Sequence, residues 1–399
     1  MRKSYGLPEK VVFCKNCVIS NQRPNSSIEF LSKSKDKKSG IIIGEDGICS
    51  ACQYTYIKDN EIDWDFREKK LLKLLDRYRS NDGNYDVVVP GSGGKDSAFT
   101  SHLLKYKYGM NPLTVTWAPH LYTDIGFENF TNWVHVGGFD NILYTPNGKL
   151  HRLLTSLAFK NLLHPFQPFI VGQRIIGPRI AQRFGIKLIM YGENQAEYGN
   201  KIDENENPEM SNSFYSVEST KKIVLGGLEI NQIIQNTDFK VGDFKPYVPL
   251  TKVEILKSNL NYQYLGYYIK WDPQECYYYS TENTGFKPNT ERTEGSYSKY
   301  SSIDDKIEPF HYYTTLIKFG LGRTSYDASQ EIRNHKITRE EGVALVKKYD
   351  QEFPKKFFKE FINYISISED EFFNVIDSFR PKHLWSKKNN DWKLKHVVQ

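Results

Sequence analysis

The sequence predicts an α/β protein with a parallel sheet, preceded by a small zinc-ribbon-like module and followed by a helical region. From residue 66 to about residue 250, short apolar runs alternate with stretches of helical character, which is the pattern of βαβ units. The loop-rich start of the chain holds four of the five cysteines, and the texture beyond residue 300 is helical. We therefore expect three parts: residues 1–65, residues 66–300 with an insertion near 200–245, and residues 301–399.

Four apolar runs in the central part are typical of buried parallel strands. They are residues 86–89, 113–117, 141–144 and 187–191. A helix is expected over residues 97–108, because Gly109 and Pro112 follow it. Residues 169–184 also carry apolar side chains at helical spacing, although Pro178 should kink or split that helix.

Two capping boxes mark helices in the last part of the chain. Residues 338–341 (TREE) and 368–371 (SEDE) each place a glutamate three residues after a Thr or Ser, and each opens an amphipathic stretch. Pro381 ends the second of these stretches.

The segment KFGLGR precedes a further helix. Thr324 is expected to be the N-cap of a helix over residues 325–333, which puts Arg323 just before a helix N-terminus. The helix dipole disfavours a cation there, and a bound anion would reverse the effect. Lys318 and Arg323 are therefore predicted to contact a phosphate or carboxylate, with ordinary surface charge as the alternative.

Composition and charge argue against a membrane or a nucleic acid as partner. The chain has 399 residues, 39% of them apolar, but no apolar run long enough to span a membrane. Its first residues lack the apolar centre of a secretory signal, so we expect a cytoplasmic protein. The net charge of +6 is small, and the basic runs at residues 33–38 and 382–395 are short and typical of solvated surface.

The stretch PGSGGKDS at residues 90–97 joins the first strand to a helix. Backbone N–H groups at a helix N-terminus lack partners within the helix, and the dipole adds positive charge there, so an anion fits the site. Gly91, Gly93 and Gly94 would let the backbone approach that anion, and Ser92 and Ser97 add hydroxyl donors. The alternative is an ordinary tight turn.

An acidic residue in this loop indicates a cation. The P-loop pattern requires Ser or Thr after its lysine, whereas here Asp96 follows Lys95. A carboxylate would repel a phosphate unless a cation stood between them, so Asp96 predicts Mg²⁺ bound together with a polyphosphate.

A second acidic stretch, YGENQAEYG at residues 191–199, follows the fourth strand. Ligands of open parallel sheets lie beyond the carboxyl ends of the strands, so this stretch and the glycine loop should face one crevice. Glu193 and Glu197 would share a helix face, where two like charges are unfavourable unless they are solvated, protonated or bridged by a cation. Trp117 and Gly192, which also follow or end strands, are further candidates for ATP binding. An ordinary acidic turn is the alternative.

The paired cysteines predict a metal centre. Cys14 and Cys17, then Cys49 and Cys52, form two C-x2-C pairs separated by 31 residues. Four thiolates suit tetrahedral Zn²⁺, and such a saturated site would serve folding only. A redox dithiol and an iron–sulfur cluster are the alternatives. Cys276 stands alone and is expected to be a buried structural thiol.

Tyrosines are concentrated in residues 262–279 and 297–313. Aromatic faces with hydroxyl groups suit a sugar or a nucleotide, so these segments are expected to form a substrate wall. Ordinary half-buried packing is the alternative.

The stretch SGGKDS is similar to the pyrophosphate loop of the N-type ATP pyrophosphatases, which have the adenine nucleotide alpha hydrolase-like (PP-loop) fold. This resemblance implies cleavage of ATP between the α- and β-phosphates, an adenylated carbonyl oxygen as intermediate, and pyrophosphate held in the loop. The 191–199 stretch loosely resembles the G-E-G-A-D-E segment of asparagine synthetases. That likeness would place Glu193 near the activated carbon and Glu197 near metal or ammonia.

Across nearly its whole length the chain resembles the N-acetyl sugar amidotransferases of bacterial surface-polysaccharide (LPS O-antigen) and flagellar-glycan pathways, especially the pseudaminic-acid branch. The matching stretches are CKNC, GICSAC, PGSGGKDS, PFIVGQR, YGENQAEYGN, EGSYSKYSSIDDKIEPFHYYTTLIKFGLGRTSYDAS and ITREEGVALVKKYD.

This second resemblance implies conversion of an acetamido group to an acetamidino group on a nucleotide-sugar or sugar-acid substrate, with ATP, Mg²⁺ and Zn²⁺ as cofactors. The chain shows no glutaminase signature. Ammonia is therefore expected from a separate glutaminase, docked through a synthase-like subunit.

Two other functions remain open from the sequence. A tRNA-modifying enzyme of the thiolation or lysidine type would also combine a zinc module with a pyrophosphate loop, but sulfur transfer needs a reactive cysteine, and only Cys276 lies outside the pairs. A non-catalytic nucleotide sensor would not require Asp96, Glu193 and Lys318 together.

Overall fold

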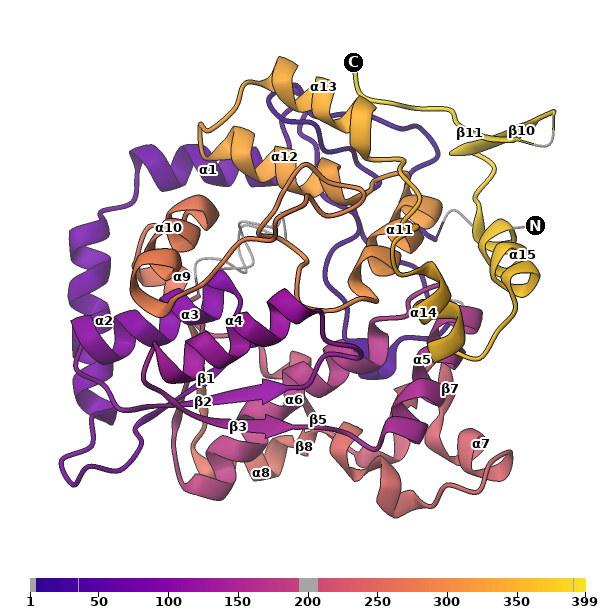
Figure 1. Ribbon diagram of the computed structural model, residues 1–399. Helices are drawn as coiled ribbons and strands as arrows, with labels where there is room; N and C mark the ends of the chain where they lie inside the picture. Colours follow the sequence, from indigo (N-terminus) through magenta and orange to yellow (C-terminus); the bar gives the residue numbers. More distant parts are fainter. Residues whose placement is uncertain (1–4, 35, 194–206, 390) are drawn as a thin grey trace.

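The computed structural model describes residues 5–34, 36–193, 207–389 and 391–399 (Figure 1). Its centre is a five-stranded sheet with the order β3-β2-β1-β4-β9, in which every neighbouring pair is parallel. The strands are β1 (Val87–Pro90), β2 (Pro112–Trp117), β3 (Asp140–Tyr144), β4 (Leu188–Tyr191) and β9 (Asn261–Tyr264). The predicted parallel sheet is confirmed. The fifth strand was not predicted, because its sequence NYQY was assigned to the tyrosine-rich wall.

The strand order contains a reversal between β1 and β4. The chain moves from β1 through β2 to β3 at one edge and then returns to β4 on the other side of β1. At such a switch point the connections on either side diverge, which leaves a crevice beyond the carboxyl ends of the strands. The loop after β1 and Glu193, which follows β4, therefore face the same crevice.

Helices cover both faces of the sheet. Parallel crossovers are right-handed, so the reversal puts α3 (Lys95–His102) and α4 (Asp124–His135) on one face and α6 (Gln167–Phe184) on the other (Figure 1). α6 packs across β1, β2 and β4, and α10 (Pro273–Thr284) packs against α3.

α3 begins earlier than predicted, because Gly94 is already its N-cap. A single π-helical turn, Leu103–Lys107, continues it to the predicted end.

Pro178 does not split its helix, since α6 is one continuous helix. Proline removes one hydrogen bond to the preceding turn, and the packing of α6 on the sheet outweighs that loss. Two glycines permit this close packing. A Cβ on Gly172 would lie 2.1 Å from the Trp117 ring, and a Cβ on Gly177 would lie 2.8 Å from the Pro90 side chain.

Between β4 and β9 the chain forms short elements. They are η5 (Asn212–Phe214), β5 (Ser216–Val217), η6 (Thr220–Lys222), β6 (Val224–Leu225), β7 (Leu228–Glu229), α7 (Ile230–Gln235), η7 (Val241–Tyr247), β8 (Leu250–Thr251) and α8 (Lys252–Ser258). β5 pairs with β8 in parallel, and β6 with β7 in an antiparallel hairpin.

The remaining elements lie at the two ends of the chain and around the sheet. They are η1 (Glu29–Leu31), α1 (Ser50–Asn60), α2 (Trp64–Tyr78), α5 (Gly148–Leu162), α9 (Leu265–Tyr268), α11 (Glu308–Phe319), α12 (Arg323–Arg333), α13 (Arg339–Tyr349), α14 (Phe358–Tyr364), α15 (Glu369–Phe379), β10 (Trp385–Lys388) and β11 (Asp391–Leu394). The capping box of Thr338 is confirmed, and Ser368 caps α15. The antiparallel β10–β11 hairpin was not predicted.

Aromatic packing joins the C-terminal helices to the rest of the molecule. Phe159 of α5 contacts Phe361 of α14 and Phe372 of α15, with ring centroids 5.6 and 5.3 Å apart. Phe310 of α11 stacks on Phe361 at 4.3 Å. These side chains belong to the same hydrophobic core as the strands of the sheet.

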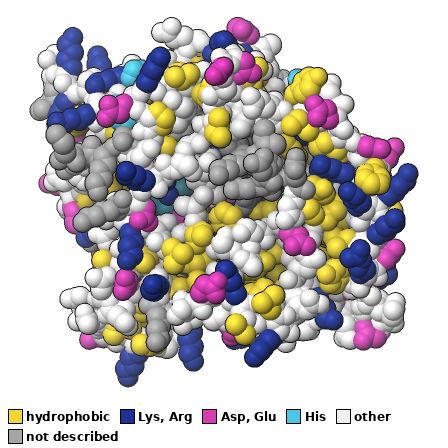
Figure 2. Space-filling model, turned by 180° about the vertical axis from the view of Figure 1, so that it is seen from behind, with side chains coloured by type: hydrophobic (Ala, Val, Ile, Leu, Met, Phe, Trp, Pro, Cys, Tyr) yellow, Lys and Arg dark blue, Asp and Glu magenta, His cyan; other side chains and the backbone are white. Residues whose placement is uncertain are grey.

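The surface carries no dominant charge on the face shown in Figure 2, where basic, acidic and apolar side chains are intermixed. In the described ranges, no helix has both the length and the apolar character that a membrane span requires.

The close contact of α6 with the sheet predicts a matched pair of glycine substitutions. Gly172→Ala would force the added Cβ against the buried Trp117 ring, so we expect the variant to lose about 1–3 kcal/mol of stability. Gly148→Ala, at the start of α5 with no heavy atom within 4 Å of the added Cβ, should be neutral or slightly stabilising. Denaturant unfolding of both variants tests this, and equal midpoints would contradict the packing described.

Candidate functional site

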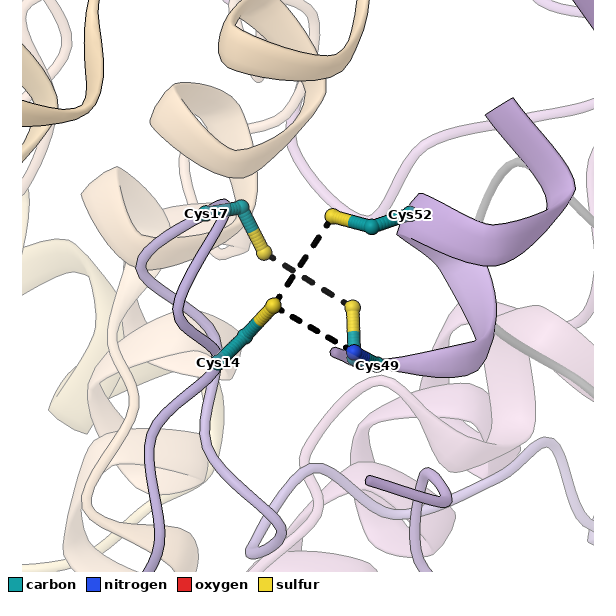
Figure 3. A group of neighbouring side chains, drawn as sticks. All are labelled: Cys14, Cys17, Cys49 and Cys52. Atoms are coloured by element: carbon teal, nitrogen blue, oxygen red, sulfur yellow. Dashed lines mark hydrogen bonds between the residues drawn. The ribbon is translucent and has the colours of Figure 1, made fainter. Parts of the chain in front are cut away.

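The four paired cysteines meet at one point (Figure 3). The Sγ atoms of Cys14 and Cys52 are 3.9 Å apart, those of Cys17 and Cys49 are 3.7 Å apart, and all four lie within 4.8 Å of one another. Tetrahedral zinc with Zn–S bonds of about 2.3 Å requires sulfurs about 3.8 Å apart, so the cluster fits zinc. None of the four forms a disulfide.

Backbone groups support thiolate character in the cluster. The N–H groups of Asn16 and Cys49 donate to Cys14 Sγ at 3.4 and 3.3 Å. Hydrogen bonds from Cys17 and then from the other two thiols lower the pKa of Cys14. Such N–H···S contacts orient metal-bound sulfurs.

The cysteine module is part of the main body rather than an appendage. Its buried residues pack with Leu321 and against Tyr326 and Ile332 of α12. The module also lines the crevice described below, through Ile19, Arg23, Ser26, Ile41 and Ala51.

The glycine loop after β1 has a shape that side chains would prevent. A Cβ on Gly91 would lie 2.1 Å from the Cβ of Ser97, and Gly93 has φ +86° with its Cα facing the backbone of Phe130. Gly94 is the N-cap of α3 and supplies no side-chain acceptor. The first amides of α3 are therefore left for another acceptor.

The two serines of the loop have different surroundings. The Ser97 hydroxyl accepts from Gly93 N at 3.3 Å and donates to Gly94 O at 3.0 Å, so it maintains the shape of the loop. Ser92 lines the open cavity in front of the loop, as does Asp304.

Lys95 and Asp96 form an ion pair of 2.5 Å at the start of α3. Burial disfavours the charge on Lys95, but the nearby anionic groups, Asp96 foremost, outweigh it and raise the Lys95 pKa. Burial raises the pKa of Glu193, and the Asp96 carboxylate raises it further. The Asp96 Oδ1 atom is buried and has no hydrogen-bond partner among the described residues, which fits a cation ligand such as Mg²⁺.

Two cavities meet at these residues. The main cavity has a volume of about 430 Å³ and the loop cavity about 250 Å³. The residues that line both are Lys95, Asp96, Glu193, Tyr300, Ser301 and Arg323. Tyr191 and Tyr264, at the carboxyl ends of β4 and β9, also line the main cavity, which therefore lies in the crevice at the strand switch.

The tyrosine-rich segments supply part of the wall. Tyr264, Tyr300 and Tyr312 come from the two predicted segments, and all three line the main cavity.

Sequence reasoning missed a second carboxylate pair, Asp304 and Glu308, in the loop cavity. Burial and Asp305 raise the pKa of Asp304, and burial and Asp304 raise that of Glu308 to about 8. Asp305 fixes this segment by accepting from His120 Nδ1 and from His120 N, both at 2.7 Å. The adjacent Asp304 and Asp305 are evident in the sequence. Asp304 comes near the glycine loop only through tertiary folding, which the sequence does not reveal.

Arg323 lines both cavities, although the predicted N-cap was wrong. Gly322 is the N-cap of α12 and Arg323 is its first residue, while the Thr324 hydroxyl donates to Gly295 O. Asp327 compensates the cation at the helix N-terminus, with Nε–Oδ1 at 2.9 Å.

Three other predicted site residues, Lys318, Trp117 and Gly192, line neither cavity. Lys318 of α11 donates to Leu162 O at 3.0 Å and lines neither cavity. Trp117 is buried against α6, and Gly192 packs against α3, where a Cβ would lie 2.9 Å from Thr100 Oγ1. Glu197 lies outside the described residues.

Cys276 is buried in α10, as expected, and burial raises its pKa well above the ordinary value. It is therefore a neutral thiol with no access to a substrate.

The cysteine cluster predicts a bound zinc ion that supports the fold. We expect purified protein to contain about one zinc per chain, and Cys49→Ser to lose it and to unfold at a lower temperature. Cys276→Ser is the matched control and should keep its zinc. Elemental analysis and thermal unfolding measure both effects; iron in place of zinc, or full zinc in Cys49→Ser, would contradict the assignment.

Lys318 predicts a pH-dependent stability term. Burial, followed by the charge of Lys38, lowers its pKa to about 7. Below this pH both the folded and the unfolded protein hold the proton, and the folded protein bears the cost of the buried charge. Above it only the unfolded chain holds the proton, so this residue makes stability rise with pH.

We therefore expect Lys318→Met to gain about 1 kcal/mol or more over the parent at pH 6, and less at pH 9. The exposed Lys359→Met variant is the control. Denaturant unfolding at both pH values measures the difference, and a gain that grows with pH would contradict the burial described.

The C-terminal part of the chain, which contributes to this site, resembles a known protein family. The family model described as "LPS biosynthesis protein WbpG-like, C-terminal domain" matches residues 294–398. That region includes the loop with Tyr300 and Asp304, Arg323 and β11. No curated protein matches the chain. The matched domain indicates a protein of lipopolysaccharide biosynthesis.

Proposed function

We propose that the protein is an ATP-dependent amidotransferase that converts an acetamido group of a sugar to an acetamidino group in bacterial surface-glycan biosynthesis. The acceptor would be a nucleotide-sugar or a sugar acid, and a separate glutaminase would supply ammonia to the enzyme in the cytoplasm. The observation that carries the proposal is the meeting of Lys95, Asp96 and Glu193 at the strand switch, directly beside the bare amides of the glycine loop.

The first step would be activation of an amide oxygen. An amide carbonyl is a poor electrophile toward ammonia, and attachment of AMP turns its oxygen into a good leaving group. The carbonyl oxygen attacks the α-phosphorus of ATP, the bond to the β-phosphate breaks, and pyrophosphate is released. The loop amides and Lys95 would bind the β- and γ-phosphates as negative charge moves onto the pyrophosphate. A magnesium ion held by Asp96 would neutralise part of the phosphate charge.

The second step would replace oxygen by nitrogen. Ammonia attacks the imidate carbon, the carbon–oxygen bond to AMP breaks, and the nitrogen gives up one proton to form the amidinium. Glu193 lies at the junction of the two cavities, and its raised pKa suits a carboxylate that accepts this proton. Arg323 also lines the loop cavity, where its guanidinium is paired with Asp327.

The described cysteines do not favour sulfur transfer to tRNA. Four thiols are gathered in the metal-binding cluster, and Cys276 is buried with a raised pKa. A thiolation enzyme needs an accessible thiolate.

Product analysis tests the proposal. Purified protein with Mg·ATP, ammonium and an N-acetylated nucleotide-sugar or sugar acid should form AMP and pyrophosphate only when both the acceptor and ammonium are present. The sugar product should show replacement of oxygen by NH in its mass. Asp96→Asn should reduce this rate about 100-fold or more, whereas the exposed Asp65→Asn on α2 should not change it. Formation of ADP and phosphate instead would refute the mechanism.

A further inference from the structure

Arg174 lies on α6 where that helix reaches the carboxyl edge of the sheet. Its guanidinium lines the main cavity beside Tyr191 and Tyr264, the last residues of β4 and β9. The sequence PFIVGQR contains this arginine, but nothing in its neighbourhood along the chain signals a role. Only the return of α6 across β4 brings it to the crevice.

The guanidinium has few protein acceptors. Within the described ranges it donates to the Met210 sulfur, at 3.6 Å, and the nearby Tyr264 hydroxyl has no hydrogen-bond partner. The rings of Tyr191 and Phe214 lie 5.5 and 6.0 Å from its central carbon. No carboxylate of the described residues is within ion-pair distance, although arginine offers five N–H donors. A cation in this setting is prepared for an anion that the protein does not itself provide.

Two other cations on the same cavity already have carboxylate partners. Arg323 pairs with Asp327, and Lys336 pairs with Asp272 at 3.2 Å and with Glu275 at 2.9 Å. An anion at those positions would compete with an existing ion pair, whereas an anion at Arg174 would not. Burial disfavours the charge on Arg174, but its surroundings more than offset burial and raise its pKa, so the side chain is charged.

The cavity has room for a sugar as well as its anionic group. Its volume of about 430 Å³ is within the usual range for small-molecule sites, and tyrosine rings line it. Lys95, Asp96 and Glu193 form another part of the same wall. A sugar in this cavity would place its acetamido group at those three residues and its charged group at a separate cation.

We propose that Arg174 binds the oxyanion of the acceptor sugar, a phosphate or a carboxylate, and so selects charged acceptors. This inference rests on the proposed function for the identity of the acceptor. Arginine suits the task because its planar fork can bind two oxygens of a phosphate or carboxylate at once.

Binding measurements with three acceptor probes test the inference. UDP-N-acetylglucosamine carries phosphates, N-acetylneuraminic acid carries a carboxylate, and methyl N-acetylglucosaminide carries neither. By calorimetry we expect the protein to bind at least one charged probe about tenfold or more tighter than the uncharged probe, and the charged probe that binds identifies the anion. Arg174→Gln should lose that preference, and Arg174→Lys should keep part of it.

Two controls separate this inference from the proposed function. Arg183→Gln, an exposed arginine on the same helix, should bind all probes as the parent does. Mg·ATP should bind to Arg174→Gln with unchanged affinity, which also shows that the variant is folded. Failure of the parent protein to bind Mg·ATP would refute the proposed function and leave the sugar measurements to decide the role of Arg174.

Three results would overturn the inference itself. They are no binding of either charged probe, equal binding of charged and uncharged probes by the parent, and a charged-probe affinity that Arg174→Gln does not change. A tenfold loss of Mg·ATP affinity in Arg174→Gln would assign the arginine to the nucleotide and would overturn it too.

Discussion

The turn between β1 and α3 depends on close contacts that leave no space for a side chain on Gly91 or Gly93. Gly91 faces Ser97 within the loop, and Gly93 faces the backbone of Phe130 on α4. The loop is therefore held between its own helix and the next one, with its amides fixed in direction before any ligand arrives. Fixed donors need no reorganisation when charge develops on a phosphate, which is how a rigid turn can stabilise a transition state.

Parts of the chain that are distant in sequence complete the crevice around this turn. The cysteine module contributes Ile41 and Ala51, α6 contributes Arg174, and the region matched by the family model contributes Tyr300 and Arg323. A metal bound by the four cysteines would hold Cys14 and Cys17 to Cys49 and Cys52, and so would also support this wall of the cavity. Zinc bound there would act on the site through structure, since four cysteine ligands leave no open coordination position.

Local signals in the sequence predicted the parts of this structure that local chemistry determines. Apolar runs identified four strands, the spacing of Cys14 and Cys17 from the second pair identified the cluster, and SGGKDS identified the loop. By contrast, β9 lacks an apolar run because its tyrosines face the crevice and its neighbours. Arg174 and Asp304 reach the site only through tertiary packing, and no local sequence pattern predicts such contacts.

Lys318 is a residue for which the local sequence gave a wrong prediction. It was expected to contact a bound anion, but it lines neither cavity. The prediction assigned both cations of KFGLGR to the N-terminus of the following helix, but only Arg323 lies there. Lys318 lies earlier, on the buried side of α11, where it donates to Leu162 O. Two cations five residues apart thus have different environments, and sequence spacing alone does not distinguish them.

The charges in the crevice favour a ligand that brings its own cation. Asp96, Glu193, Asp304 and Glu308 gather at a loop shaped for an anion, and burial together with neighbouring carboxylates raises the pKa of the last three. Free phosphate alone would add to this repulsion. A phosphate that arrives with a divalent cation would relieve it, because the cation neutralises carboxylates and phosphate oxygens at once. If the proposed function holds, these four carboxylates favour binding of the metal–nucleotide complex over free phosphate. The amides of α3 then need only orient the bound complex.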